Sequence, residues 1–166
     1  MVLGIIASLL SVATPSLRKL MTKNQLQAAQ TDFMAGLQAA RATAITSGRR
    51  TVFCPSVDGA RCSGSSRWES GWLLARSANA DKQPDGAPIY SGRGYAGKLR
   101  IQSTVGRHMV RFSPDGTARG SNITLLFCSP GNPEGALTIV VSNAGRVRGA
   151  KGDRQQVATC AGLADG

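Results

Sequence analysis

Residues 25–56 read QLQAAQTDFMAGLQAARATAITSGRRTVFCPS, and the fold is decided here because the hydrophobic periodicity changes at Gly48. Before Gly48, apolar residues recur at spacings of three or four, as on one face of an amphipathic helix; they are Leu26, Ala29, Phe33, Leu37, Ala40 and Ala44. Glycine readily takes the left-handed conformation that ends a helix. After it, Thr51–Cys54 has the composition of a strand. We therefore predict a helix over residues 16–47 that packs against a sheet region over residues 49–160.

The residues before this helix form an apolar segment. Val2–Ala13 (VLGIIASLLSVA) carries no charge and ends at Thr14-Pro15. A membrane-crossing helix needs about 20 apolar residues, and the run lacks the basic region and cleavage site of a secretory signal. We therefore expect residues 1–15 to be a truncated hydrophobic helix, which in a longer form of the protein lies in a membrane or in a filament core.

Downstream of the helix, short β-rich runs alternate with turn residues. The predicted strands are Thr51–Cys54, Trp72–Arg76, Leu99–Ser103, Met109–Phe112, Ile123–Cys128 and Leu137–Val141. Pro114-Asp115-Gly116 and Asn143-Ala144-Gly145 are tight-turn signals, and Ser77–Tyr95 is typical of a long surface loop. A helix followed only by strands predicts an α+β fold, with one globular domain over residues 16–166 in which the helix packs on one antiparallel sheet.

The cysteines favour disulfides and an oxidising compartment. Their number is even and no Cys-x-x-Cys spacing occurs. We infer the pairs Cys54–Cys62 and Cys128–Cys160 among the three connectivities that four cysteines permit. The second bridge would tie the C-terminal segment to the sheet. Zinc is disfavoured because the single histidine, His108, lies far from every cysteine in sequence.

The charge balance is strongly basic, with 20 Lys and Arg against 9 Asp and Glu, a net charge of +11 and an isoelectric point near 10.6. Such a surface attracts nucleic acid, anionic lipid headgroups or acidic polysaccharide. An enzyme is disfavoured because His108 stands in no nucleophile motif and no phosphate-cradling glycine loop occurs. We expect no catalytic residue, no metal and no cofactor.

An apolar N-terminal helix, an amphipathic continuation and a cysteine-bearing antiparallel sheet form the layout of type IV pilins and type II secretion pseudopilins. Within that group the chain resembles the FimT/GspH family, and most closely FimT. The segments that carry this resemblance are Ala39–Ile45 (AARATAI), Val52–Ser56 (VFCPS), Trp68 with Gly71-Trp72, Phe112–Gly116 (FSPDG) and Ile139–Arg148 (IVVSNAGRVR). Pilin precursors have a basic leader ending in Gly and then Phe-Thr-Leu-Ile-Glu, whereas this chain opens with Met1-Val2-Leu3 inside the apolar segment.

The resemblance implies a location and partners. It implies a single-pass inner-membrane protein with a periplasmic globular domain, which moves to the cell surface when it assembles into a pilus with other major and minor pilins. The membrane statements apply to a form with a full-length N-terminal helix.

The segment Gly145-Arg146-Val147-Arg148 is the strongest candidate site. A β-type alternation puts Arg146 and Arg148 on the same side of the chain, and a guanidinium can bind two phosphate oxygens at once. FimT proteins linked to DNA uptake carry a G-R-x-R motif, which this segment matches. The resemblance therefore implies sequence-independent binding of double-stranded DNA through its phosphates. Lys151 and Arg154 follow as supporting cations.

Several alternatives stay open at this stage. The arginines of the motif could be merely solvated, and Arg49 and Arg50 could either extend the basic surface or be solvated too. Trp68 and Trp72 could stack on bases, although we favour a core position for Trp72, with Trp68 covering it. The rival functions are a structural minor pilin that primes or caps pilus assembly, and a GspH-like pseudopilin of type II secretion.

Overall fold

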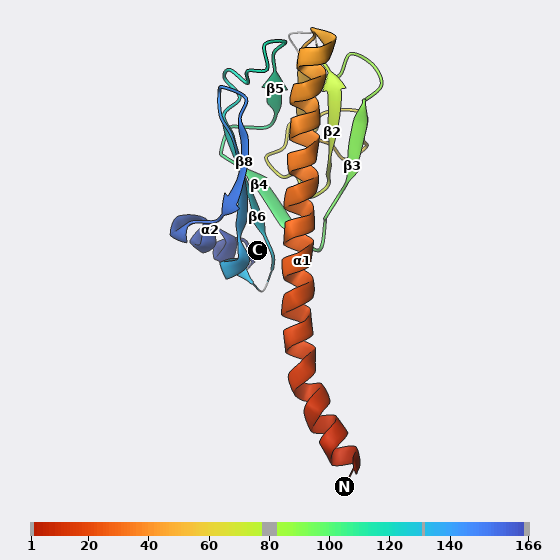
Figure 1. Cartoon of the computed structure of the whole chain (residues 1–166), viewed down its shortest axis with the longest axis vertical. Coiled ribbons are helices and arrows are strands. Elements are labelled where there is room, and N and C mark those ends of the chain that lie inside the picture. Colours follow the sequence, from red (N-terminus) through yellow and green to blue (C-terminus); the bar gives the residue numbers. More distant parts are fainter. Residues whose placement is uncertain (1, 78–82, 131, 165–166) are drawn as a thin grey trace.

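The computed structural model describes residues 2–77, 83–130 and 132–164, with the side chains of residues 20–77, 83–130 and 132–163. Helix α1 (Val2–Ser47) is one continuous helix that passes Pro15 without a break. Its C-terminal half lies against the sheets and its N-terminal half projects beyond them (Figure 1). Within the described residues, no helix is both long enough and apolar enough to cross a membrane.

The strands form two antiparallel sheets of four strands each. The first has the order β3-β2-β1-β5 and contains β1 (Thr51–Pro55), β2 (Gly71–Arg76), β3 (Tyr90–Arg93) and β5 (Val110–Phe112). The second has the order β4-β6-β7-β8 and contains β4 (Arg100–Ser103), β6 (Ile123–Cys128), β7 (Leu137–Val141) and β8 (Val147–Lys151). A 3-10 turn, η1 (Pro133–Gly135), precedes β7, and helix α2 (Arg154–Ala164) follows β8.

The predicted α+β fold, with a long N-terminal helix on antiparallel strands, is confirmed, but the prediction of a single sheet is wrong. Four elements were not predicted: β3, η1, β8 and α2. Strand β3 lies inside the predicted surface loop Ser77–Tyr95, of which residues 78–82 are outside the described part. Both missed strands are sheet edges with mostly exposed residues, so they lack the alternation of apolar and polar residues that marks a half-buried strand.

The apolar stripe of α1 forms the centre of the core. All six residues of the predicted stripe are buried, with at most 1% of their surface exposed. Phe33 meets Phe53, Trp68, Trp72 and Phe127 edge-on, with ring centroids 5.3 to 6.2 Å apart. The predicted core position of Trp72 is confirmed, because 6% of its surface is exposed, and Trp68 lies in the same core with 0% exposed. Neither indole is therefore available to stack on a nucleic-acid base.

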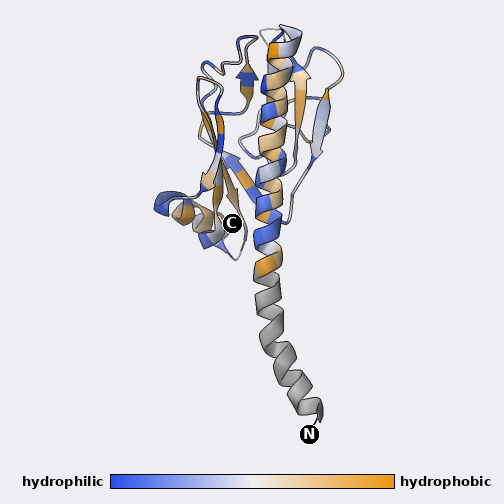
Figure 2. Cartoon of the chain, in the orientation of Figure 1, coloured by the Kyte–Doolittle hydropathy of each residue, from blue (hydrophilic) through white to orange (hydrophobic). Residues whose placement is uncertain are grey.

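A glycine lets α1 approach the first sheet closely. A Cβ atom on Gly36 would lie 2.7 Å from the Phe53 ring and 2.9 Å from the Trp72 ring. Figure 2 shows mostly hydrophobic colours on β2, and both hydrophobic and hydrophilic colours on the strands of the second sheet. The core thus lies between α1 and the faces of both sheets that point toward it.

The chain between β1 and β2 joins the two sheets. The backbone N–H of Trp68 donates to the Ile101 carbonyl oxygen over 2.8 Å, and the backbone N–H of Ser103 donates to the Ser66 carbonyl oxygen over 2.9 Å. These bonds add a short extended segment to the edge of β4 in the second sheet. One loop of the first sheet is thereby part of the second.

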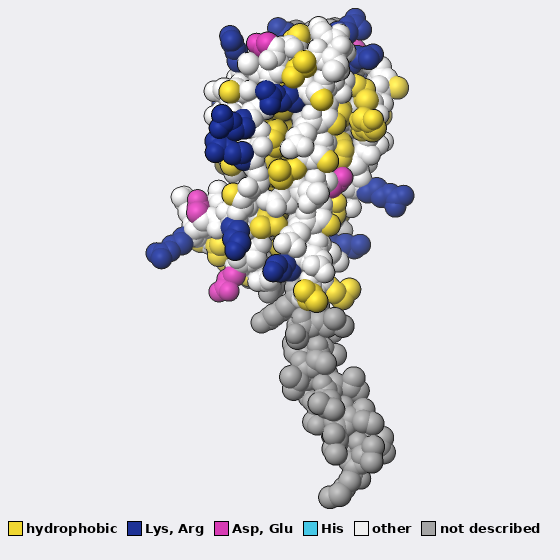
Figure 3. Space-filling view, in the orientation of Figure 1, with side chains coloured by type: hydrophobic (Ala, Val, Ile, Leu, Met, Phe, Trp, Pro, Cys, Tyr) yellow, Lys and Arg dark blue, Asp and Glu magenta, His cyan; other side chains and the backbone are white. Residues whose placement is uncertain are grey.

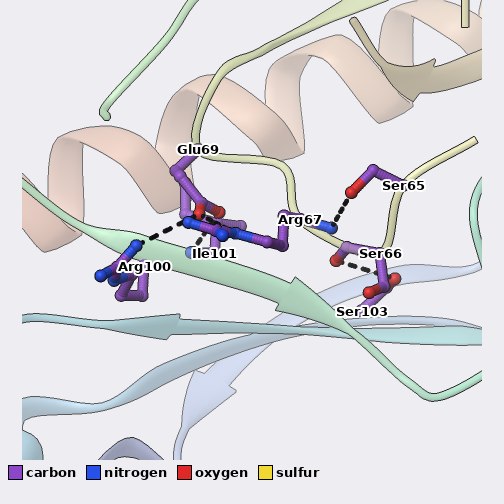
Figure 4. A network of polar contacts seen from close by, with 7 residues as sticks. All are labelled: Ser65, Ser66, Arg67, Glu69, Arg100, Ile101 and Ser103. Atoms are coloured by element: carbon purple, nitrogen blue, oxygen red, sulfur yellow. Dashed lines mark hydrogen bonds and ion pairs between the residues drawn. The ribbon is translucent and has the colours of Figure 1, made fainter. Parts of the chain in front are cut away.

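A buried carboxylate stabilises this junction (Figure 4). Glu69 is 3% exposed. Its Oε1 accepts a hydrogen bond from Arg67 Nε over 2.7 Å and lies 3.8 Å from Arg100 Nη1. Its Oε2 accepts a hydrogen bond from the Ile101 N–H over 3.3 Å. Glu69 thus connects the β1–β2 loop with β4.

We expect the substitution Glu69→Ala to lower the free energy of unfolding by about 1 to 3 kcal/mol, because it leaves the buried Ile101 N–H without its acceptor. Urea unfolding followed by circular dichroism measures the change. Glu134→Ala removes the same charge at an exposed position in η1 and serves as the control. Equal stability of the two variants would contradict this role for Glu69.

Candidate nucleic-acid interface

The β7–β8 hairpin carries Arg146 just before β8 and Arg148 within it. Val141 pairs with Val147 and Val140 with Arg148. Val147 packs against the core, whereas Val140 is 41% exposed. Because side chains alternate along a strand, Arg148, which pairs with Val140, lies on the face that points away from α1. We call this face, on both sheets, the outer face. Arg146 lies just before the strand and also lines a hollow with Arg41 and Ile45 of α1.

Both guanidiniums are exposed and available for a ligand. Neither Arg146 nor Arg148 pairs with a carboxylate among the described residues. The backbone of Arg146 is fixed at the start of the strand, because its carbonyl oxygen accepts a bond from the Ser142 N–H over 3.0 Å. Its own N–H donates to Ser142 Oγ over 3.2 Å. Figure 3 shows Lys and Arg side chains gathered along the edge of the molecule that β8 forms.

Gly145 has a positioning role in this hairpin rather than a ligand-binding one. Its φ angle is +76°, and a Cβ atom there would lie 1.9 Å from the carbonyl oxygen of Gly116. The same oxygen accepts a bond from Arg41 Nε over 3.0 Å, and the Ala118 N–H donates to the Asn143 carbonyl oxygen over 2.9 Å. The two predicted tight turns thus pack against each other, and only glycine fits where they touch.

We expect Gly145→Ala to lower the free energy of unfolding by about 2 to 3 kcal/mol, because both a positive φ angle and an overlap with backbone must be relieved. Thermal unfolding monitors the loss. Gly97→Ala is the matched control, because its φ angle is +77° but nothing lies within 4 Å of the added atom. If both variants lose the same stability, the packing of the two turns contributes nothing.

Lys151 and Arg154 do not share the face of Arg148. A Cβ atom on Gly149 would lie 2.8 Å from Met34 Sδ on α1, so Lys151, two residues later in β8, also lies on the side toward α1. Arg154 begins α2. All four predicted cations are exposed, but of these only Arg148 is placed on the outer face by its strand pairing.

Helix α2 and its disulfide cover part of the outer face of the second sheet. The inferred pairs Cys54–Cys62 and Cys128–Cys160 are both present. Around the second bridge, Leu126 and Ala136 pack with Val157 and Leu163 of α2. The helix starts with a reciprocal cap, in which Asp153 and Gln156 each accept a bond from the other's N–H. The end of the outer face that carries Arg148 is left open.

Arg49 and Arg50 lie apart from β8, and both are exposed. Arg50 lines a hollow on the outer face together with Arg107, Arg111 and Arg119, whereas Arg49 does not. Sequence reasoning missed these last three arginines, because they come from a strand and from the loops on either side of it and form no local motif. The net charge of +11 was the only signal of them in the sequence.

The fold is that of minor pilins and pseudopilins. The crystal structure of the type IV minor pilin FimU of Pseudomonas aeruginosa is similar at 23% identity, over 75% of this chain and 87% of FimU, with a TM-score of 0.62. The minor pseudopilin EpsH from the type 2 secretion system of Vibrio cholerae is similar at 16% identity, over 75% of this chain and 95% of EpsH, with a TM-score of 0.53. At these identities the likeness shows the fold alone.

The family model described as Type II transport protein GspH matches residues 29–145, and the chain belongs to this family. Its relatives are pilins and pseudopilins, which are structural proteins rather than known enzymes, and membership implies association with other pilins in a filament. The match ends just before Arg146, so it does not include the cations of β8. No curated protein sequence matches the chain.

Proposed function

We propose that the chain is a FimT-like minor type IV pilin that binds extracellular double-stranded DNA through its phosphates for uptake in natural transformation. The observation that carries this proposal is the pair of exposed guanidiniums, Arg146 just before β8 and Arg148 within it. Both lack a carboxylate partner among the described residues. They stand on a chain with a net charge of +11.

The geometry of a strand suits a phosphate backbone. Residues two apart in a strand are separated by about 6.6 to 6.8 Å, so Arg146 and Arg148 can each contact a phosphate of their own. Such contacts fix the position of a duplex but do not read its sequence. Binding is therefore expected to be independent of sequence and to weaken steeply as salt is added.

The direction in which the arginines point also suits this function. In the proposed filament α1 lies in the core, and in a longer form its N-terminal end anchors the subunit in the inner membrane before assembly. Arg148 points away from α1, and Arg146 directly precedes the same exposed edge strand. They would therefore face the periplasm in the unassembled subunit and the outside of the filament at the cell surface, where DNA can reach them.

A second candidate function is a purely structural one, in which the subunit primes or caps a pilus or acts in a type II secretion pseudopilus. It is favoured by the apolar surface where α1 leaves the sheets, since Leu20 and Met21 are 55% and 56% exposed. A neighbouring subunit could cover these side chains. Under this hypothesis the basic face of β8 meets an acidic neighbour instead of DNA.

The two functions are separated by counting filaments and measuring uptake of labelled duplex DNA in cells that carry Arg146→Ala with Arg148→Ala. The DNA-binding proposal predicts normal filament numbers and at least tenfold less uptake, because only the affinity for phosphate is lost. The control variant is Arg93→Ala with Lys98→Ala, which removes two exposed positive charges outside β8. It should leave DNA uptake unchanged. A loss of filaments in the first variant would instead support the structural function.

A further inference from the structure

A hollow of about 530 Å³ is lined by β5 and by the loops that precede and follow this strand. The β4–β5 loop supplies Gly106 to Met109, β5 supplies Arg111, and the turn and loop that lead to β6 supply the segment from Ser113 to Ser121. Arg50, just before β1, completes the lining. None of the cations of β8 lines this hollow.

The hollow is strongly cationic. Arg50, Arg107, Arg111 and Arg119 line it, and its only carboxylate is that of Asp115. Asp115 Oδ1 accepts hydrogen bonds from the Thr117 N–H over 3.0 Å and from Thr117 Oγ1 over 2.7 Å. These bonds, with a smaller contribution from Arg119, lower the pKa of Asp115 below its usual value. One charge therefore opposes four at neutral pH, and that carboxylate is already held by its own turn.

One cation of the hollow, Arg107, is held by a hydrogen bond, and one donor of Arg111 lacks an acceptor. Arg107 Nη1 donates to the Gly120 carbonyl oxygen over 2.9 Å, and the Arg111 N–H donates to Ser121 Oγ over 3.2 Å. The loops before and after β5 are thereby tied together. Arg111 Nε is shielded from solvent and has no hydrogen-bond partner among the described residues. A buried donor without an acceptor is costly, and an oxyanion seated here would supply one.

The hollow adjoins the β7–β8 turn that leads to the β8 arginines. Arg111 pairs with Val52, whose side chain packs with Met109 in the cluster on the outer face of the first sheet. Thr117 lines the hollow, and the backbone N–H of the next residue, Ala118, donates to the Asn143 carbonyl oxygen in the β7–β8 turn. Arg146 follows that turn directly. A polyanion on the outer face could therefore contact both places.

We infer that this hollow is a phosphate-binding site, and that it takes a phosphate group of the same duplex whose backbone contacts Arg146 and Arg148. The choice of DNA as the source rests on the proposed function, whereas the affinity for phosphate rests on the hollow itself. Four guanidiniums around one space suit the tetrahedral oxygens of a phosphate, because each guanidinium offers forked donors.

The first arm of the test follows the Arg111 Nε–Hε signal of the full chain by NMR during titration with sodium pyrophosphate. A shift of this signal that saturates is expected, and it should disappear in Arg107→Ala with Arg119→Ala. Because Arg107 also holds Gly120, the single variant Arg119→Ala is measured as well, and circular dichroism confirms that each variant folds. No shift with pyrophosphate or with duplex DNA would overturn the site.

The second arm titrates the same protein with a random-sequence duplex. If the duplex shifts Arg111 Nε–Hε, and Arg119→Ala weakens duplex binding by about 8-fold at 0.1 M salt, as expected for one lost phosphate contact, DNA is the source of the phosphate. If pyrophosphate shifts the signal but bound duplex does not, DNA as the source is overturned. If no duplex binds at all, the proposed function fails, and the pyrophosphate arm still decides whether the hollow binds phosphate.

Discussion

The variant Arg146→Ala with Arg148→Ala is expected to bind duplex DNA about 60-fold more weakly than the parent chain at 0.1 M salt. Each phosphate contact contributes about 0.9 to the slope of log K against log salt, so two lost contacts reduce the slope by about 1.8. Between 1 M salt, where this phosphate contribution vanishes, and 0.1 M salt, a slope difference of about 1.8 corresponds to a factor of about 60 in affinity. Fluorescence anisotropy of a labelled duplex at several salt concentrations measures both quantities.

The control for this prediction removes the same charge elsewhere. Arg93→Ala with Lys98→Ala changes two exposed cations near β3, at the far edge of the first sheet from β5. If affinity depended only on net charge, both double variants would lose the same affinity. We expect the control to keep most of the parent slope, and equal losses would show that β8 is not a localised site.

Removal of the Cys128–Cys160 disulfide by alanine at both positions is expected to lower the free energy of unfolding by about 3 to 4 kcal/mol. The bridge has a sequence separation of 32 residues, and the chain-entropy model gives this value for a loop of that length. Its loss also releases α2 from the outer face, where the helix is otherwise held by Leu126, Ala136, Val157 and Leu163. Guanidinium unfolding of parent and variant measures the difference.

The other disulfide provides the comparison. Cys54–Cys62 has a sequence separation of only 8 residues, so its removal is expected to cost about 1 kcal/mol less in the same model. A larger loss for Cys54→Ala with Cys62→Ala would show that packing in the cluster around Val52 and Leu73 outweighs loop entropy. Equal DNA affinity is expected for both disulfide variants where they fold, because neither bridge includes a phosphate contact.

The sequence predicted the parts of the fold that rest on buried periodic residues. The stripe from Leu26 to Ala44 repeats at the helical period because it faces the sheets along its whole length, and every residue of it is buried. The six predicted strands correspond to β1, β2, β4, β5, β6 and β7, with small differences in their ends. These strands contribute most of the buried core outside α1.

The sequence did not predict elements that are stabilised by neighbours rather than by their own pattern. Strand β3 reads Tyr-Ser-Gly-Arg. It can lie against β2 because Gly92 leaves room for the Trp72 indole: a Cβ atom on Gly92 would lie 2.1 Å from this ring. Helix α2 is held to β6 by a disulfide. The division into two sheets depends on which strands pair over long distances, and local patterns do not specify that.

The candidate site was predictable only where it is local in sequence. The alternation Arg146-Val147-Arg148 predicts a shared side, and the register of β8 places Arg148 on the outer face. It does not predict that Lys151 lies on the other face or that Arg154 starts a helix. The cationic hollow joins residues 50 to 121 through tertiary contacts, so no stretch of the sequence could indicate it.

The most direct test of the central claim is the salt dependence of duplex binding by the parent chain itself. Anisotropy titrations of two unrelated duplexes between 0.05 and 0.2 M salt are sufficient. We expect both duplexes to bind equally with dissociation constants on the order of micromolar at the low end of this range, within the scale of non-specific protein–DNA affinities, and a slope of about −1.8 or steeper. No binding at 0.05 M salt, or binding that does not weaken with salt, would contradict the account.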